Sequence, residues 1–247
     1  MPVIDPTTTQ KRTALALLNT VLGELGMPLT NSVNAQDDTT LQLLYLANGL
    51  GSRMAKLPFW ADLAEEFTVT TTTAEAYDLP ADWGVPLYAT TWDRSNRWPL
   101  VGPVTSSQWQ VLKSGLGQAY PRFRFRYKGG QFLLHTAPEA GHTIVQEYLS
   151  TGWVLGVNGA TATQRKPRIS ADSDYVLLDE EMFITGTKLA WLEAKGLDSS
   201  KALVEFNAML EAGWANNSGA PVLEFVRTDE QVLLGYQNIP DTGYGPP

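Results

Sequence analysis

The chain has 247 residues, of which 43% are hydrophobic and 18% are charged, so it is long enough to bury the core of one or two domains. Its formal net charge of −8 argues against a protein that grips nucleic acid, because such proteins carry a basic excess. The absence of cysteine excludes disulfides, thiolate catalysis, zinc–thiolate sites and iron–sulfur clusters.

The N-terminal residues show no basic segment followed by an apolar stretch, and no apolar run reaches the roughly 18–20 residues of a membrane span. We therefore expect a soluble protein made in the cytoplasm. Apolar residues between Lys11 and Leu25 then recur at spacings of three and four, which predicts a helix. Gly26 is a typical residue to end it.

A second helix is expected to begin near Asp37 and to end at Pro58. Gly49 and Gly51 weaken its middle, each by about 1 kcal/mol relative to alanine. Either the helix kinks at these glycines, or a neighbouring element packs closely against them.

From residue 66 to residue 155 the pattern favours a β-rich unit, because β-branched and aromatic residues alternate with polar ones. Thr105 to Leu112 predicts a short helix within it, and Gly129-Gly130 indicates a two-residue hairpin turn. The expected strands cover residues 67–72, 87–92, 98–101, 121–127, 131–135 and 143–148.

Residues 156–172 are rich in glycine, asparagine, threonine and alanine, so we expect a loop. Helical spacing returns from Asp174 to Lys195, and a fourth helix follows with Asp198 or Ser199 as its cap. Ala215 to Ala220 is interpreted as a linker.

This order of elements predicts an α+β fold. The expected architecture is an antiparallel helical bundle, formed by residues 1–65 and 173–215, that carries an inserted β-rich domain of residues 66–172. Residues 216–247 are expected to form an extended C-terminal arm.

Few residues suggest chemistry. His135 and His142 lack the spacing of a zinc site, and the acidic run Asp179 to Glu181 fits the positive end of a helix dipole. Asp78, Asp82 and Asp93 lie near aromatic residues, as in a sugar site, but turn formation explains the first two equally well. No phosphate-binding or nucleophile motif is present. We therefore predict no catalytic residue, no metal site, no cofactor and no enzyme activity.

One strand is strongly basic on one face. Alternation in this strand places Phe123, Phe125 and Tyr127 on one side and the basic residues on the other, namely Arg122, Arg124, Arg126 and Lys128. The basic side is either an ordinary solvated face or a contact for an acidic or phosphate-bearing partner.

The C-terminal segment carries more apolar side chains than a segment of its length can bury by itself. Burying one such side chain contributes roughly 1.5–3 kcal/mol, so we expect the segment to dock onto another chain. The predicted contact residues are Val222, Leu223, Phe225, Val226, Val232, Leu233, Leu234 and Tyr236.

Several stretches within residues 12–215 resemble the head-to-tail adaptors of podoviruses, also called tail tubular protein A-like or head completion proteins. The similar stretches are Leu22 to Pro28, Tyr77 to Trp83, Trp92 to Leu100, and the third helix with its exit and the fourth helix, from Asp172 to Asn207.

The resemblance implies a virion protein of the phage neck, made in the host cytoplasm. It implies a ring of twelve copies between the portal protein, which the C-terminal arm would bind, and the tail nozzle protein. DNA would pass through this ring without sequence-specific binding. Twelve copies would carry about 100 formal negative charges, and an acidic channel offers few contacts to phosphates.

Two alternatives stay open. One is another phage tail or baseplate component. The other is a carbohydrate-binding or glycoside-cleaving domain, which eight tryptophans and nine tyrosines would suit.

Overall fold

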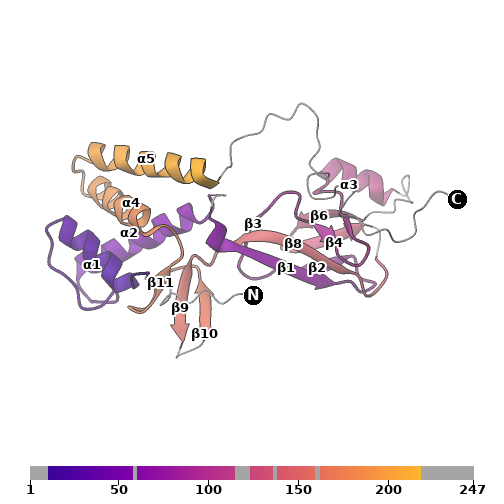
Figure 1. Ribbon diagram of the computed structural model, residues 1–247, viewed down its shortest axis with the longest axis horizontal. Helices are drawn as coiled ribbons and strands as arrows, with labels where there is room; N and C mark the ends of the chain where they lie inside the picture. The colour runs from indigo at the N-terminus through magenta and orange to yellow at the C-terminus, as the bar shows by residue number, and fades with distance from the viewer. Residues whose placement is uncertain (1–10, 58–59, 115–122, 136–137, 159–161, 218–247) are drawn as a thin grey trace, which may run out of the picture.

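The computed structural model describes residues 11–57, 60–114, 123–135, 138–158 and 162–217. They form a mixed fold of helices and antiparallel sheets, which confirms the predicted α+β class. Figure 1 shows two lobes side by side: a helical lobe, containing α1, α2, α4 and α5, and a β lobe, containing β1 to β8 and α3. Residues 218–247 of the predicted C-terminal arm lie outside the described residues.

The first two helices form where their spacing predicts them. Helix α1 (Ala14–Glu24) is capped by the Thr13 hydroxyl, which accepts from the backbone N–H of Ala16, and α2 (Asp38–Met54) is capped by Asp37. A Cβ atom at Gly51 would overlap the ring of Trp153, a residue that is 0% exposed. The glycine in α2 therefore permits close packing by a neighbour.

Helix α4 (Glu180–Ala194) packs against α1, α2 and α5 (Ser200–Asn217). It begins six residues after the predicted start at Asp174, because Tyr175–Val176 form strand β11 instead. The predicted linker was also wrong at its start, since α5 continues to Asn217. The alanine and the two asparagines at residues 215–217 are compatible with a helix, because the rest of α5 is already held by packing against α4.

The larger sheet of the β lobe has the order β1-β8-β4-β5, and β3 also pairs with β8. Its strands are β1 (Ala64–Thr70), β3 (Trp83–Pro86), β4 (Trp92–Asp93), β5 (Trp98–Pro99) and β8 (Thr143–Ser150), and a 3-10 turn, Ala61–Leu63, precedes β1. The predicted strand at 87–92 was wrong except at Trp92. The Gln146 amide holds residues 87–90 in a loop by donating to the Leu87 carbonyl and the Thr90 hydroxyl, each at 2.8 Å.

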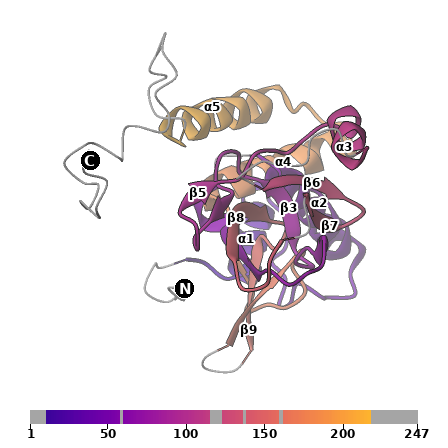
Figure 2. The ribbon, with the colours of Figure 1, turned by 90° about the vertical axis from the view of Figure 1, so that its right-hand side faces the viewer.

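A second sheet has the order β2-β7-β6, with β2 (Ala76–Asp78), β6 (Arg124–Lys128) and β7 (Gln131–His135). The predicted two-residue turn is confirmed, with Gly129 and Gly130 at φ of 61° and 76°. Side chains from both sheets meet in one apolar cluster, in which Phe125, Phe132, Leu134, Leu100 and Ile144 are buried. Helix α3 (Ser106–Lys113) lies at the outside of the β lobe, as Figure 2 shows from the end of that lobe.

Residues 156–172 were predicted as a loop, but residues 156–158 and 162–166 lie in two paired strands, so the prediction was wrong there; residues 167–172 form no helix or strand. Strands β9 (Val154–Asn158) and β10 (Ala162–Lys166) pair along their whole length, and β11 pairs with the first two residues of β9. The base of the hairpin packs into the core of the helical lobe through Trp153, Val154 and Leu155. These buried side chains anchor the hairpin and explain why it forms. The small polar residues that follow them in the sequence gave no sign of this anchoring.

Candidate interaction surfaces

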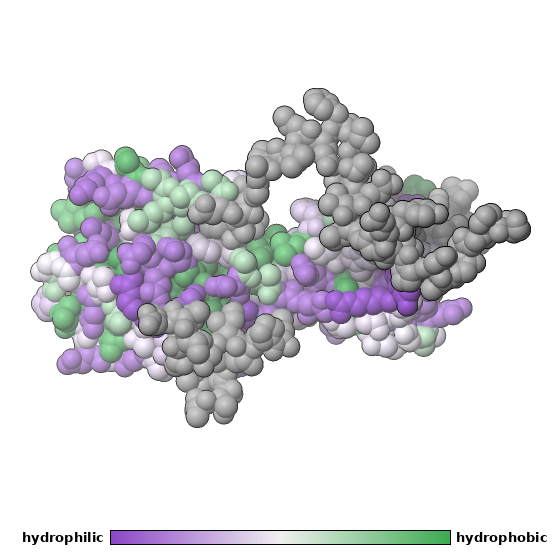
Figure 3. Space-filling view, in the orientation of Figure 1, coloured by the Kyte–Doolittle hydropathy of each residue, from purple (hydrophilic) through white to green (hydrophobic). Residues whose placement is uncertain are grey.

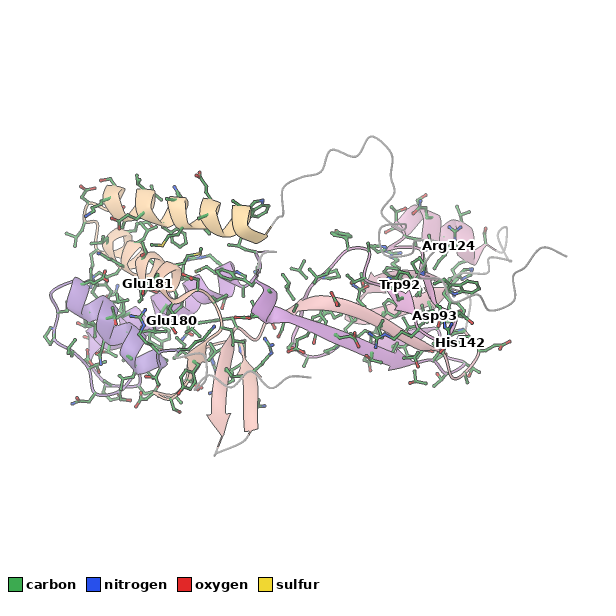
Figure 4. The ribbon with its side chains drawn as sticks, in the orientation of Figure 1. Trp92, Asp93, Arg124, His142, Glu180 and Glu181 are labelled. Carbon is green, nitrogen blue, oxygen red and sulfur yellow. The ribbon has the colours of Figure 1, made fainter. Side chains whose placement is uncertain are left out.

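The acidic run at the start of α4 is occupied by capping and ion pairing. The Asp179 carboxylate accepts from the backbone N–H of Met182 at 2.8 Å and so caps the helix. Arg12 joins Glu180 at 2.7 Å and Glu181 at 2.5 Å, and these contacts raise the pKa of its guanidinium despite partial burial. Figure 4 labels the two glutamates.

A depression of about 480 Å³ lies beside this cluster, lined by residues that include Lys11, Trp60 and Asp62. Its acidic side chains are matched by basic ones, since Lys11 lies 3.5 Å from Asp62. The run at 179–181 therefore stabilises the helix start and its contact with the N-terminal segment, as helix-dipole complementarity predicts.

The other acidic candidates also have structural partners. Asp93 is fully buried and accepts from the backbone N–H groups of Ser95 and Asn96 at 2.9 and 3.0 Å, and His142 lies 3.4 Å away (Figure 4). Asp82 accepts from the hydroxyls of Tyr148 and Ser150. These carboxylates close turns and join strands.

Within the residues that the structure describes, no three histidine or acidic side chains gather in a way that could hold a metal ion. Asp78 accepts from the side-chain amide of Gln131 at 2.9 Å.

The aromatic residues mostly build the core. Four of the tryptophans are buried: Trp60, Trp109, Trp153 and Trp191. Trp83 stacks on Tyr148 with ring centroids 4.5 Å apart, within the β lobe. Among the described tryptophans, only Trp214 is among the exposed large apolar residues. Tyr45 of α2 and Tyr88, in the loop between β3 and β4, are also exposed, so the exposed large aromatic rings among the described residues come from three separate elements.

The alternation of the basic strand is confirmed in β6. Phe125 is buried at 2% exposure, whereas Arg124, Arg126 and Lys128 share the opposite face. Cross-strand pairing adds His135, Leu133 and Gln131 of β7 to that face. Arg122 lies outside the described residues.

Helix α3 covers part of this basic face. Trp109 makes an edge contact with His135 at 5.9 Å between ring centroids, and Leu133 packs against the buried cluster of α3. The Arg126 guanidinium donates to the Ser106 hydroxyl at 2.7 Å, at the start of the helix. Burial, with the nearby charge of Lys113, lowers the pKa of His135. Lys128 is exposed at the end of the row.

All the described elements from α1 to α5 lie within a segment of the chain that one family model matches. A family model described as SU10 adaptor protein matches residues 12–217. The chain belongs to the SU10 adaptor protein family. Its resemblance to phage head-to-tail adaptors is thereby confirmed, and the protein is a structural adaptor of the phage virion. A comparison with individually curated proteins found no match.

The matched segment ends where α5 ends, so the predicted arm contacts from Val222 to Tyr236 lie beyond both the family match and the described residues. Among the described parts of the chain, no helix of the adaptor is long and apolar enough to cross a membrane.

The adaptor exposes several large apolar side chains on its helices and loops. Figure 3 shows green and pale green atoms on the helical lobe, including along its upper edge, where α5 lies. Tyr45 of α2 is 73% exposed, and Val204 of α5 is 69% exposed. Sequence reasoning did not identify these side chains as exposed, because helical spacing does not show which apolar residues a neighbouring element covers.

Proposed function

We propose that the adaptor forms a ring of twelve copies that joins the portal protein to the tail nozzle protein and forms part of the DNA channel. The match of residues 12–217 to the SU10 adaptor protein family carries this proposal, because it includes all the described helices and sheets. Exposed apolar side chains on a chain with 18% charged residues support it, since such surfaces favour contact with protein partners.

The net charge of −8 per copy supports the passage of DNA. Acidic walls repel phosphates and form few lasting contacts with them, so DNA slides through such a channel without being held or read.

The C-terminal arm, residues 216–247, is proposed to bind the portal protein. Its apolar residues between Val222 and Tyr236 would provide the contact. The helical lobe would serve as an antiparallel bundle that presents the arm. Helix α4 would form the centre of this bundle, because α4 packs against α1, α2 and α5.

The basic face of β6 is proposed as a second contact, toward an acidic or phosphate-bearing neighbour. Lys128 is exposed at the end of this face, and Arg124 and Arg126 lie half-buried in the same row beside α3.

Electron microscopy of the adaptor mixed with the portal protein of the same phage tests the ring. We expect twelve-fold rings on the portal, and a monomer or weak oligomer when the adaptor alone is sedimented at micromolar concentration. Rings of another symmetry, or attachment to a tail tube without portal, would favour the alternative of a different tail component.

Truncation after Ala220 tests the arm. The shortened protein should keep its melting temperature, because the matched elements end before this residue, but it should no longer assemble on the portal. Normal assembly of the truncated protein would contradict the assignment of the arm.

A further inference from the structure

Helix α3 is held on the outside of the β lobe by a small apolar contact. Only Trp109 and Leu112 of its eight residues are buried. With Val104, just before the helix, they form a cluster that is separate from the apolar core between the two sheets, and Leu133 of β7 packs against this cluster. Elements with few buried apolar contacts open locally at a lower free energy than the core of a domain.

Two polar contacts at the rim complete the attachment of the helix. The Arg126 guanidinium donates to the Ser106 hydroxyl at 2.7 Å, and Lys113 forms an ion pair with Glu75. Both contacts join exposed groups, and contacts of this kind contribute little to stability. The attachment of α3 therefore depends mainly on its small apolar cluster and on what lies beneath it.

His135 is the ionisable residue beneath the helix. Its ring makes an edge contact with Trp109 at 5.9 Å between centroids, and its Nδ1 atom is buried without a hydrogen-bond partner among the described residues. A neutral imidazole carries one N–H, which can be on Nε2, whereas a protonated imidazole carries a second N–H on Nδ1. That second donor would lack an acceptor while α3 is docked, so docking favours the neutral ring.

The charges near His135 also favour the neutral ring. Lys113 of α3 is close by, and Arg124 lies opposite His135 in the neighbouring strand β6. The nearby acid is Glu75, which Lys113 engages in an ion pair. Burial and then the charge of Lys113 lower the pKa of His135, against the smaller opposing effect of Glu75. Release of α3 removes both the cover and Lys113, so the released state takes up a proton more readily than the docked state.

We infer that α3 is a releasable cover over the basic face of β6 and β7, and that protonation of His135 favours its release. Docking is favoured above about pH 6.5 and weakens as the pH falls below this value, because the docked state binds the proton less tightly. Release uncovers Leu133 and the charged His135, in the row that also holds Arg124 and Arg126. The face then becomes more accessible and more basic. The inference concerns a single chain and does not depend on the proposed ring.

Amide hydrogen exchange of the full-length protein, measured by mass spectrometry, tests the release. Between about pH 7.5 and about pH 5.5, ordinary carboxylates stay ionised, and the side chains that titrate are the two histidines. We expect the protection of residues 106–113, corrected for the intrinsic exchange rate, to fall by at least about threefold across this range. Protection of β1 and β8 should stay within about twofold. Unchanged protection of α3, or an equal loss in β1 and β8, would overturn the inference.

His135→Phe tests the role of the imidazole. The variant keeps an aromatic ring against Trp109, loses no hydrogen bond at Nδ1 and binds no proton. Protection of α3 should then be equal at both pH values within about twofold, and His135→Gln, which also binds no proton, should behave alike. The matched control is His142→Phe, because the His142 ring contacts Phe123. This control should retain the loss of protection. A loss in both His135 variants as large as in the original protein would refute the role of His135.

Single cysteines measure access to the covered face, because the chain has no cysteine of its own. Leu133→Cys places a thiol beneath α3, and Ser107→Cys places one on the exposed side of α3. Dividing the maleimide labelling rate of the first variant by that of the second at the same pH removes the pH dependence of the thiol itself. We expect this ratio to rise by at least about threefold between about pH 7.5 and about pH 5.5. A constant ratio would contradict the release and would leave the proposed ring and the proposed basic contact untouched.

Discussion

The contact between α2 and Trp153 gives the sharpest prediction about stability. Changing Gly51 to alanine adds a Cβ atom that overlaps the indole ring of Trp153. The ring is fully buried among side chains of the helical core, and it also packs against Phe183 at 5.7 Å between centroids. It therefore has little space into which it can move.

The expected effect is the difference between two opposing contributions. Overpacking a well-filled core costs about 1–3 kcal/mol, and three overlapping ring atoms place this site at the upper end. Replacing glycine by alanine inside a helix returns about 1 kcal/mol. We expect Gly51→Ala to lower the free energy of unfolding by about 1–2 kcal/mol, which corresponds to a fall in melting temperature of roughly 2–8 °C.

Gly49→Ala in the same helix is the matched control, because a Cβ atom there meets nothing within 4 Å. It should raise the free energy of unfolding by about 0.5–1 kcal/mol. Urea unfolding and calorimetry of the two variants measure the difference directly. If Gly51→Ala stabilised the adaptor as much as Gly49→Ala, the close packing of Trp153 on α2 would be refuted.

Two further predictions concern α3 and the strand beneath it. Burial lowers the pKa of His135 below its ordinary value of 6.5, so the unfolded chain takes up a proton more readily than the folded one. Stability should be complete above about pH 6.5 and should decrease as the pH falls below it, and His135→Phe should weaken that decrease in urea titrations at several pH values. Thr105→Ala removes the hydroxyl that accepts from the backbone N–H of Gln108, and it should lower the unfolding free energy by about 1 kcal/mol, whereas Ser107→Ala should change it little. A loss of equal size in the serine variant would argue against the cap.

Local chemistry made much of the fold predictable. Thr105 and Gln108 form the capping box that starts α3, and Gly129-Gly130 forms the expected turn because both residues adopt positive φ. The alternation of β6 was likewise readable, since apolar residues every second position must turn to one side.

Features that depend on contacts between distant segments of the chain could not be predicted from the sequence. The hairpin at 154–166 reads as a loop, because its stability depends on Trp153 and Ile169 packing among helices. The covering of the basic face by α3 depends on Trp109 reaching His135, which no local pattern encodes. The acidic run at 179–181 was correctly assigned to the helix start, but its partner Arg12 is remote in the chain.

The pairing of β1 with β8 has a consequence for how such adaptors diversify. The chain leaves the helical lobe through β1 and returns through β8, and Ala64 lies opposite Leu149 at that junction. Neighbouring antiparallel strands have Cα atoms about 4.5–5.5 Å apart, so departure and return occur at almost one point. The segment between these residues can therefore change in length without moving the helices apart, as long as Val85 and Leu87, which pack against the helical core, are retained.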